Sequence, residues 1–175
     1  MFQEPHGDLD EAVPSQFLIS VVMECTPSEN PWLDVTWEAV GVTAKVLDGD
    51  SSNRQVTLVH ERDGIKQYLN SGFHLQLFVD ECESYYHNLC SPSPSCFVIA
   101  TEDSEGIPIP KIVSLSFDEA HAYLEVEEQV YAVAMPPELY RWCELFVLNH
   151  YVPELKKKRR LTNWKQGESQ GAHNE

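Results

Sequence analysis

The side chains in this sequence that come closest to acting together chemically are thiols and an imidazole on one predicted helix. Cys82 and Cys90 lie eight residues apart on a predicted helix, with His87 between them. Such groups can hold zinc, or a thiol and an imidazole can act as nucleophile and base. On an unbroken helix, the rise of about 1.5 Å per residue separates the two Cα atoms by roughly 12 Å, too far for one zinc ion to bridge. The spacing therefore favours ordinary packing or exposed polar positions, and we assign no metal ligands.

The other reactive groups form no further constellation. The cysteines contain no C-x-x-C pair, and their odd number argues against a closed disulfide framework, so we expect reduced thiols at Cys25, Cys82, Cys90, Cys96 and Cys143. Acidic clusters such as Glu102, Asp103 and Glu105 fall in predicted loops or helix ends, which is typical of a solvated face. The eight glycines form neither G-x-G-x-x-G nor a phosphate-binding loop. The sequence predicts no catalytic residues and no cofactor.

Apolar residues at predicted turns are more informative. Trp32 and Trp37 lie in the segment ENPWLDVTW, and Met135, Pro136 and Pro137 precede the longest predicted helix. A tryptophan near prolines in a loop either plugs the local core or anchors a protein interface. We predict these five residues as the partner-binding set.

Charge divides the chain into an acidic body and a basic end. Up to residue 155 there are six basic and 26 acidic residues, a formal charge of −20; after it there are six basic and two acidic residues, a charge of +4. Because an acidic body repels phosphate backbones, nucleic-acid binding by the folded part is disfavoured. The run KKKRR could contact an anionic partner or membrane, although a solvated terminal run is the simpler interpretation.

No targeting or membrane-spanning segment is evident. The sequence has no run of about 18 apolar residues, and its first twenty residues carry acids where a secretory signal would be basic and then apolar. We expect a cytoplasmic protein without membrane insertion. The domain prediction is a mobile N-terminal arm at 1–14, a single globular domain at 15–155, and a basic, mostly disordered tail at 156–175.

The elements that must position these residues follow from hydrophobic periodicity. Helices are predicted from a capping box at Asp80 and Glu83, from another at Ser116 and Glu119, and from Pro137. Strands are predicted at 16–25, 37–47, 54–61, 65–69, 73–79, 96–101, 111–116 and 128–135. Because the helices enter late and do not alternate with every strand, the pattern favours an α+β fold. We expect a curved antiparallel sheet or partial barrel of about eight short strands with three helices, the longest at the C-terminus.

Two separated patterns resemble a known family. Val21 to Glu24, Asn30 with Trp32, and Trp37 with Val40, Gly41 and Val42 form the first; Ala120 to Val130 followed by Val133 to Pro137, and then the basic run, form the second. They resemble an uncharacterised bacterial family, domain of unknown function three-three-zero-five, over roughly residues 16–160. Members are typically encoded near molybdenum-dependent formate dehydrogenases. The resemblance implies an accessory or assembly role there, and it carries over no catalytic or cofactor residues.

We therefore expect a non-catalytic accessory protein whose partner is a formate dehydrogenase subunit or maturation factor. The alternative is a small enzyme or a metal- or cofactor-carrying protein that uses Cys82, His87 and Cys90.

Overall fold

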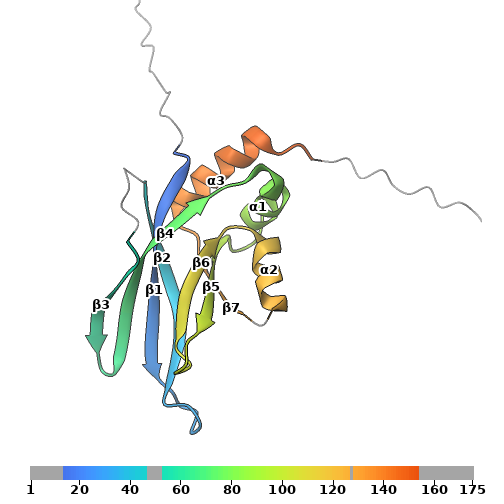
Figure 1. Ribbon diagram of the computed structural model, residues 1–175. Coiled ribbons are helices and arrows are strands. Elements are labelled where there is room, and N and C mark those ends of the chain that lie inside the picture. The colour runs from blue at the N-terminus through green and yellow to red at the C-terminus, as the bar shows by residue number, and fades with distance from the viewer. Residues whose placement is uncertain (1–13, 47–52, 127, 154–175) are drawn as a thin grey trace, which may run out of the picture.

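The structure is a computed structural model that describes residues 14–46, 53–126 and 128–153. Within those ranges, seven strands form two antiparallel sheets, accompanied by three α-helices (Figure 1). The predicted fold class is confirmed, including the placement of the longest helix at the C-terminal side. The predicted arm, apart from Pro14, and the predicted tail lie outside the described residues. In the described part, no helix has the length and apolar character needed to cross a membrane.

The larger sheet has the strand order β2-β1-β4-β3. Its strands are β1 (Gln16–Pro27), β2 (Val35–Val46), β3 (Gln55–Arg62) and β4 (Ile65–Gln76). In β1 every second side chain is buried, as an alternating apolar pattern requires of a strand with one face on the core. β3 is exposed along its whole length because it extends beyond the second sheet.

Two predicted strands, at 65–69 and 73–79, are one continuous strand in the structure. β4 runs through Gly72, whose φ of +90° is a conformation that other residues rarely adopt. A Cβ atom there would lie 2.7 Å from the carbonyl oxygen of Asn53. The segment between the two predicted strands is therefore a site where the backbone just before β3 approaches β4 closely, and it is not a turn.

The smaller sheet has the order β6-β5-β7, built from β5 (Ser95–Glu102), β6 (Pro108–Ser114) and β7 (Gln129–Ala134). It faces the larger sheet, with β6 against β4 and β7 against β2. Alternate apolar residues of β1 and β5 fill the space between the two sheets. The arrangement matches the expected partial barrel, and the two sheets do not close into a full barrel.

The helices are α1 (Cys82–Leu89), α2 (Phe117–Glu125) and α3 (Pro137–His150). The predicted cap of α2 is confirmed, because Ser116 Oγ accepts a hydrogen bond of 3.1 Å from the backbone N–H of Glu119. The predicted start of α3 is also confirmed, with proline in its first turn. The Asp80 cap is wrong: a 3₁₀ turn at Val79–Glu81 precedes α1, which begins without a side-chain cap.

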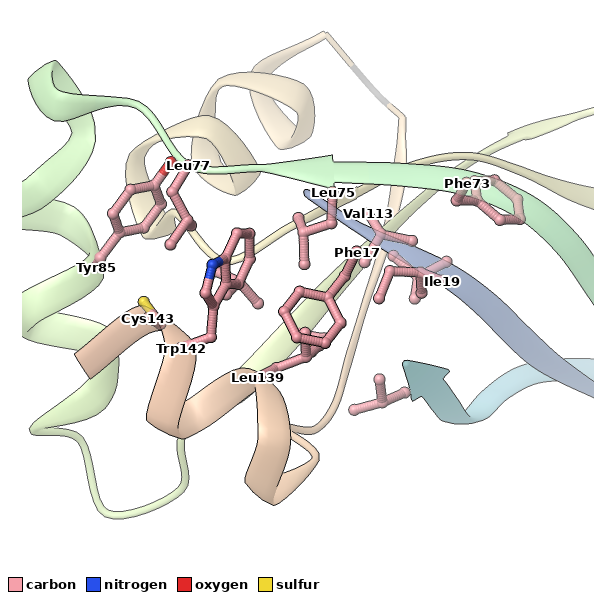
Figure 2. Close-up of a cluster of buried hydrophobic side chains, with 14 of the residues drawn as sticks. Phe17, Ile19, Phe73, Leu75, Leu77, Tyr85, Val113, Leu139, Trp142 and Cys143 are labelled. Atoms are coloured by element: carbon pink, nitrogen blue, oxygen red, sulfur yellow. The ribbon is translucent and has the colours of Figure 1, made fainter. Parts of the chain in front are cut away.

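Helix α3 closes one end of the space between the sheets. Figure 2 shows Leu139 and Trp142 of α3 pointing toward Phe17 of β1. The Trp142 and Phe17 ring centroids lie 4.9 Å apart, and Trp142 Nε1 donates a 2.7 Å hydrogen bond to the carbonyl oxygen of Pro14. The indole therefore buries its apolar surface and satisfies its donor. Helix α2 covers the outer face of the smaller sheet through a separate cluster around Phe97, Ile99 and Ala120.

The molecule therefore has two different ends. At the helix end, α1 and α3 cover the sheets (Figure 1). At the opposite end, which we call the loop end, lie three turns at residues 28–34, 63–64 and 103–107. The first two are neighbours, because a Cβ atom on Gly64 would lie 3.0 Å from Pro27 Cγ.

Candidate functional site

Trp32 occupies the tip of the hairpin between β1 and β2, and 89% of its surface is exposed. The turn around it is held by side chains and backbone. Asn30 Oδ1 accepts a hydrogen bond of 3.0 Å from the Trp32 N–H, and Ser28 Oγ accepts one of 3.0 Å from the Asn30 N–H. Backbone hydrogen bonds from Leu33 to Asn30 and from Ser28 to Asp34 close the turn. A fixed turn thus presents a bare indole to solvent.

Trp37 behaves differently although it lies only five residues further on. It is half-buried in β2, packs against the core, and lies near Tyr68 with ring centroids 5.6 Å apart and an interplanar angle of 36°. Of the two interpretations open for a loop tryptophan, Trp32 has the exposure of an anchor and Trp37 is partly a core plug.

The other three predicted binding residues lie at the start of α3, at the helix end. Met135 is half-buried against the core, and its N–H donates a 3.1 Å hydrogen bond to the carbonyl oxygen of Pro94. Pro137 borders a shallow depression together with Pro92 and Tyr140. The structure therefore separates Met135, Pro136 and Pro137 from Trp32 and Trp37, which lie at or near the loop end. Partner binding by any of the five stays a prediction.

The predicted Cys82, His87 and Cys90 group does not converge. Cys82 is buried, whereas His87 and Cys90 are exposed, and His87 Nε2 lies 3.7 Å from Glu83 Oε1. Among the residues that the structure describes, no group of three His, Cys, Asp or Glu side chains could hold a metal ion.

The structure instead places the buried thiol of Cys143 near two others, those of Cys82 and Cys96. Burial raises the pKa of Cys143 to about 12, with a further contribution from Cys82. Burial likewise raises the pKa of Cys96 to about 12, with a contribution from Cys143. These groups are neutral thiols at physiological pH, and a neutral thiol is a poor nucleophile and a poor metal ligand.

A polar network joins the starts of α1 and α2. Ser116 Oγ donates to Glu81 Oε2 at 2.5 Å and lies 3.0 Å from Ser84 Oγ, which accepts from the Asp118 N–H. Ser114 Oγ donates to Glu119 Oε2. Each of these hydroxyls has a partner, and Ser84, Ser114 and Ser116 are buried, so the network fixes α1 against α2 away from solvent.

A cleft between the β3–β4 hairpin and β6 was not foreseen from the sequence. It consists of two adjoining cavities of about 300 Å³ each, which share Val56, Asn70 and Ile109. The cavity nearer the loop end is mostly apolar and is also lined by Met23, Trp37, Tyr68, Ile107 and Pro108. The inner cavity adds charged and polar groups, with Arg54, Gln55, Ser71, Phe73, Pro110 and Lys111 in its lining. We call the two together the β3–β6 cleft.

Arg54 reaches across the inner end of the β3–β6 cleft, which is the end away from the loop end. Its guanidinium carbon lies 3.7 Å from the centre of the Phe73 ring, and its Nη2 donates a 2.9 Å hydrogen bond to the carbonyl oxygen of Lys111. The close approach of the two backbones at Gly72, where an added Cβ would also lie 3.0 Å from the Arg54 nitrogen, allows this placement. Arg54 is exposed overall, and the partial burial of its side chain lowers the pKa of the guanidinium. No local motif signals this site, because Arg54 and Lys111 are 57 residues apart.

The fold and the exposed surface together define the class of protein. It is a small α+β protein whose core lies between two sheets that do not close into a barrel. An ordered hairpin carries an exposed tryptophan, and a mostly apolar cleft lies near that hairpin. Residues 18–160 match the model of the family described as protein of unknown function (DUF3305), so the chain belongs to that family. The match confirms the resemblance recognised in the sequence. Neither a curated protein nor a solved structure matches the chain.

Proposed function

We propose that this protein is a non-catalytic accessory protein that binds a component of a molybdenum-dependent formate dehydrogenase system, with Trp32 as its anchor. The observation that carries the binding role is the exposed indole on an ordered hairpin. The choice of partner, a dehydrogenase subunit or a maturation factor, rests on the family resemblance. The proposed location is the cytoplasm, which fits five cysteines without paired spacing.

The energetics favour binding at the Trp32 hairpin. Tryptophan is enriched among the few interface residues that contribute about 2 kcal/mol or more to affinity. Because the Asn30 and Ser28 hydrogen bonds already hold the turn, binding has less loop entropy to remove. Leu33 and Val35, which are also exposed, extend the apolar surface along the same hairpin.

Charge supports a basic partner surface. The −20 formal charge before residue 156 would steer the protein toward a positive patch and raise the association rate at low salt.

The buried thiols also favour an accessory role over chemistry, since raised pKa values keep Cys96 and Cys143 protonated.

Affinity purification of the tagged full chain from its own host tests this proposal. We expect recovery of a formate dehydrogenase subunit or maturation factor, identified by mass spectrometry, and at least a tenfold lower yield with Trp32→Ala. Leu148→Ala is the matched control, because Leu148 is 74% exposed but lies on α3 at the helix end. Failure to recover any such component would contradict the choice of partner, and equal recovery with Trp32→Ala would contradict the anchor.

Metal analysis separates this proposal from its rival. The accessory role predicts that purified protein contains far less than one equivalent of zinc or iron. It also predicts that combined replacement of Cys82, His87 and Cys90 by Ser, Ala and Ser leaves partner recovery unchanged. One stoichiometric equivalent of metal, lost in that variant, would favour the carrier hypothesis.

A further inference from the structure

The β3–β6 cleft has the composition of a small-molecule site. Ligand-binding clefts are mostly apolar and carry a few polar groups that fix orientation. Here the apolar lining is continuous from Trp37 and Tyr68, near the loop end, through Val56 and Ile109 to Phe73. The polar groups gather at the inner end, so the cleft is itself amphipathic.

The inner end is positive in a body that is otherwise strongly acidic. Only six Lys and Arg residues precede residue 156, and two of them, Arg54 and Lys111, line this cavity. Two others on the same hairpin are already paired, Arg62 with Asp63 at 3.3 Å and Lys66 with Glu61 at 3.4 Å. Within the described ranges, Arg54 and Lys111 make no ion pair, so their positive charge is available to an anion.

Arg54 is also held in a geometry that suits a carboxylate. The guanidinium carries five N–H donors, and its described contacts use one of them on the Lys111 carbonyl and one face on the Phe73 ring. A planar fork that is already fixed loses little entropy on binding and can hold a carboxylate through two hydrogen bonds. The partial desolvation of its charge would be relieved by an anion placed beside it.

The geometry points to the β3–β6 cleft as a binding site for a small amphipathic carboxylate. Arg54 and the Lys111 ammonium take the carboxylate, and the apolar chain lies along Val56 and Ile109 toward Trp37 and Tyr68. The distance from Ile107, the residue just before β6, to Lys111 within β6 is about 13 Å at roughly 3.3 Å per residue. A chain of about the length of decanoate spans that distance. This inference does not depend on the proposed partner or on Trp32.

Titration calorimetry with decanoate, below its micelle-forming concentration, tests the site in the full-length protein. We expect saturable binding, with decanol and decyltrimethylammonium at least tenfold weaker because they lack the anion. Lys111→Met should lower the affinity for decanoate at least tenfold, and it leaves in place the backbone carbonyl that Arg54 contacts. Lys45→Met is the matched control, since Lys45 lies on β2 and does not line the cleft, and it should bind like the wild type.

The orientation has its own test. An ω-bromo derivative of decanoate should quench tryptophan emission in the wild type, and most of that quenching should disappear in Trp37→Phe. The proposal is overturned by a lack of saturable decanoate binding, by equal affinity for decanol, or by wild-type affinity in Lys111→Met. Because neither experiment involves a protein partner, such a failure is distinguishable from failure of the Trp32 anchor.

Discussion

Trp142 and Trp32 belong to opposite ends of the same molecule, and the contrast between them separates stability from recognition. At the helix end, Trp142 is 5% exposed, lies against Phe17 and donates its N–H to a backbone carbonyl. At the loop end, Trp32 leaves 89% of its surface in solvent on a turn that other groups hold in place. An indole that is buried and whose N–H has an acceptor stabilises the fold. An exposed indole on an ordered turn can still bury its apolar surface against a partner and so contribute to affinity.

Replacing each tryptophan with alanine tests this contrast directly and has the largest expected effect. Trp142→Ala should lower the free energy of unfolding by about 3–5 kcal/mol, because it opens a cavity in the core. Trp32→Ala should change it by less than about 0.5 kcal/mol, because the indole packs on nothing that folding buries. Urea unfolding followed by circular dichroism measures both. A loss at Trp32 comparable to that at Trp142 would break the distinction between the two ends.

A pH titration of stability sharpens the description of the helix end. Cys96 and Cys143 have pKa values near 12 in the folded state, above the ordinary value of about 8.5 for the unfolded chain. The folded state therefore holds these protons more tightly. The stabilisation is fully present below the unfolded pKa and is lost as the pH rises toward the folded value. We expect the free energy of unfolding to fall by on the order of 4 kcal/mol between pH 8 and pH 10, about half of it through each thiol.

The matched variants identify the groups responsible. Cys143→Ala should flatten the fall in stability, whereas Cys90→Ala should leave it unchanged because Cys90 is exposed. Equal slopes in the wild type and Cys143→Ala would show that the buried thiols do not account for the pH dependence.

Gly72 offers a smaller test of the region that leads to the cleft. Gly72→Ala should destabilise the protein by about 1–3 kcal/mol, since φ of +90° and the Asn53 oxygen at 2.7 Å both exclude a Cβ atom. Gly41→Ala is the matched control in β2, where nothing lies within 4 Å of the added atom, and it should be close to neutral. Thermal unfolding of both variants measures the difference. Equal unfolding midpoints would mean that the backbone just before β3 can move away from residue 72 without a loss of stability.

Local signals predicted most of the fold. The alternation in β1, the Ser116 cap and the proline at the start of α3 are each encoded within a few residues, and the structure has all three. The predicted break in β4 was wrong because Gly72 serves a contact with Asn53, nineteen residues away in the chain. A glycine that permits close approach and a glycine that makes a turn have the same letter in the sequence.

The candidate site was only partly predictable for the same reason. Trp32 and Trp37 were recognised as candidates, but their different exposures depend on Tyr68 and the core, which lie far along the chain. The β3–β6 cleft required Arg54 and Lys111 to meet across two sheets, and no spacing rule connects them. Tertiary contacts, rather than residue type, decide which apolar and charged groups remain available for binding.

Thiol labelling gives the mildest test, because it measures local opening without changing any residue. At pH 8, iodoacetamide should modify the exposed Cys90 first. Cys25 should follow, since it lies near the end of β1 that leads to the loop end and is less deeply buried than Cys96 and Cys143. Those two require opening of the core at the helix end and should react last. Peptide mass spectrometry over a time course gives the order of labelling. Labelling of Cys143 as fast as Cys25 would show that α3 opens as readily as the hairpin that carries Trp32. The two ends would then not differ in local stability.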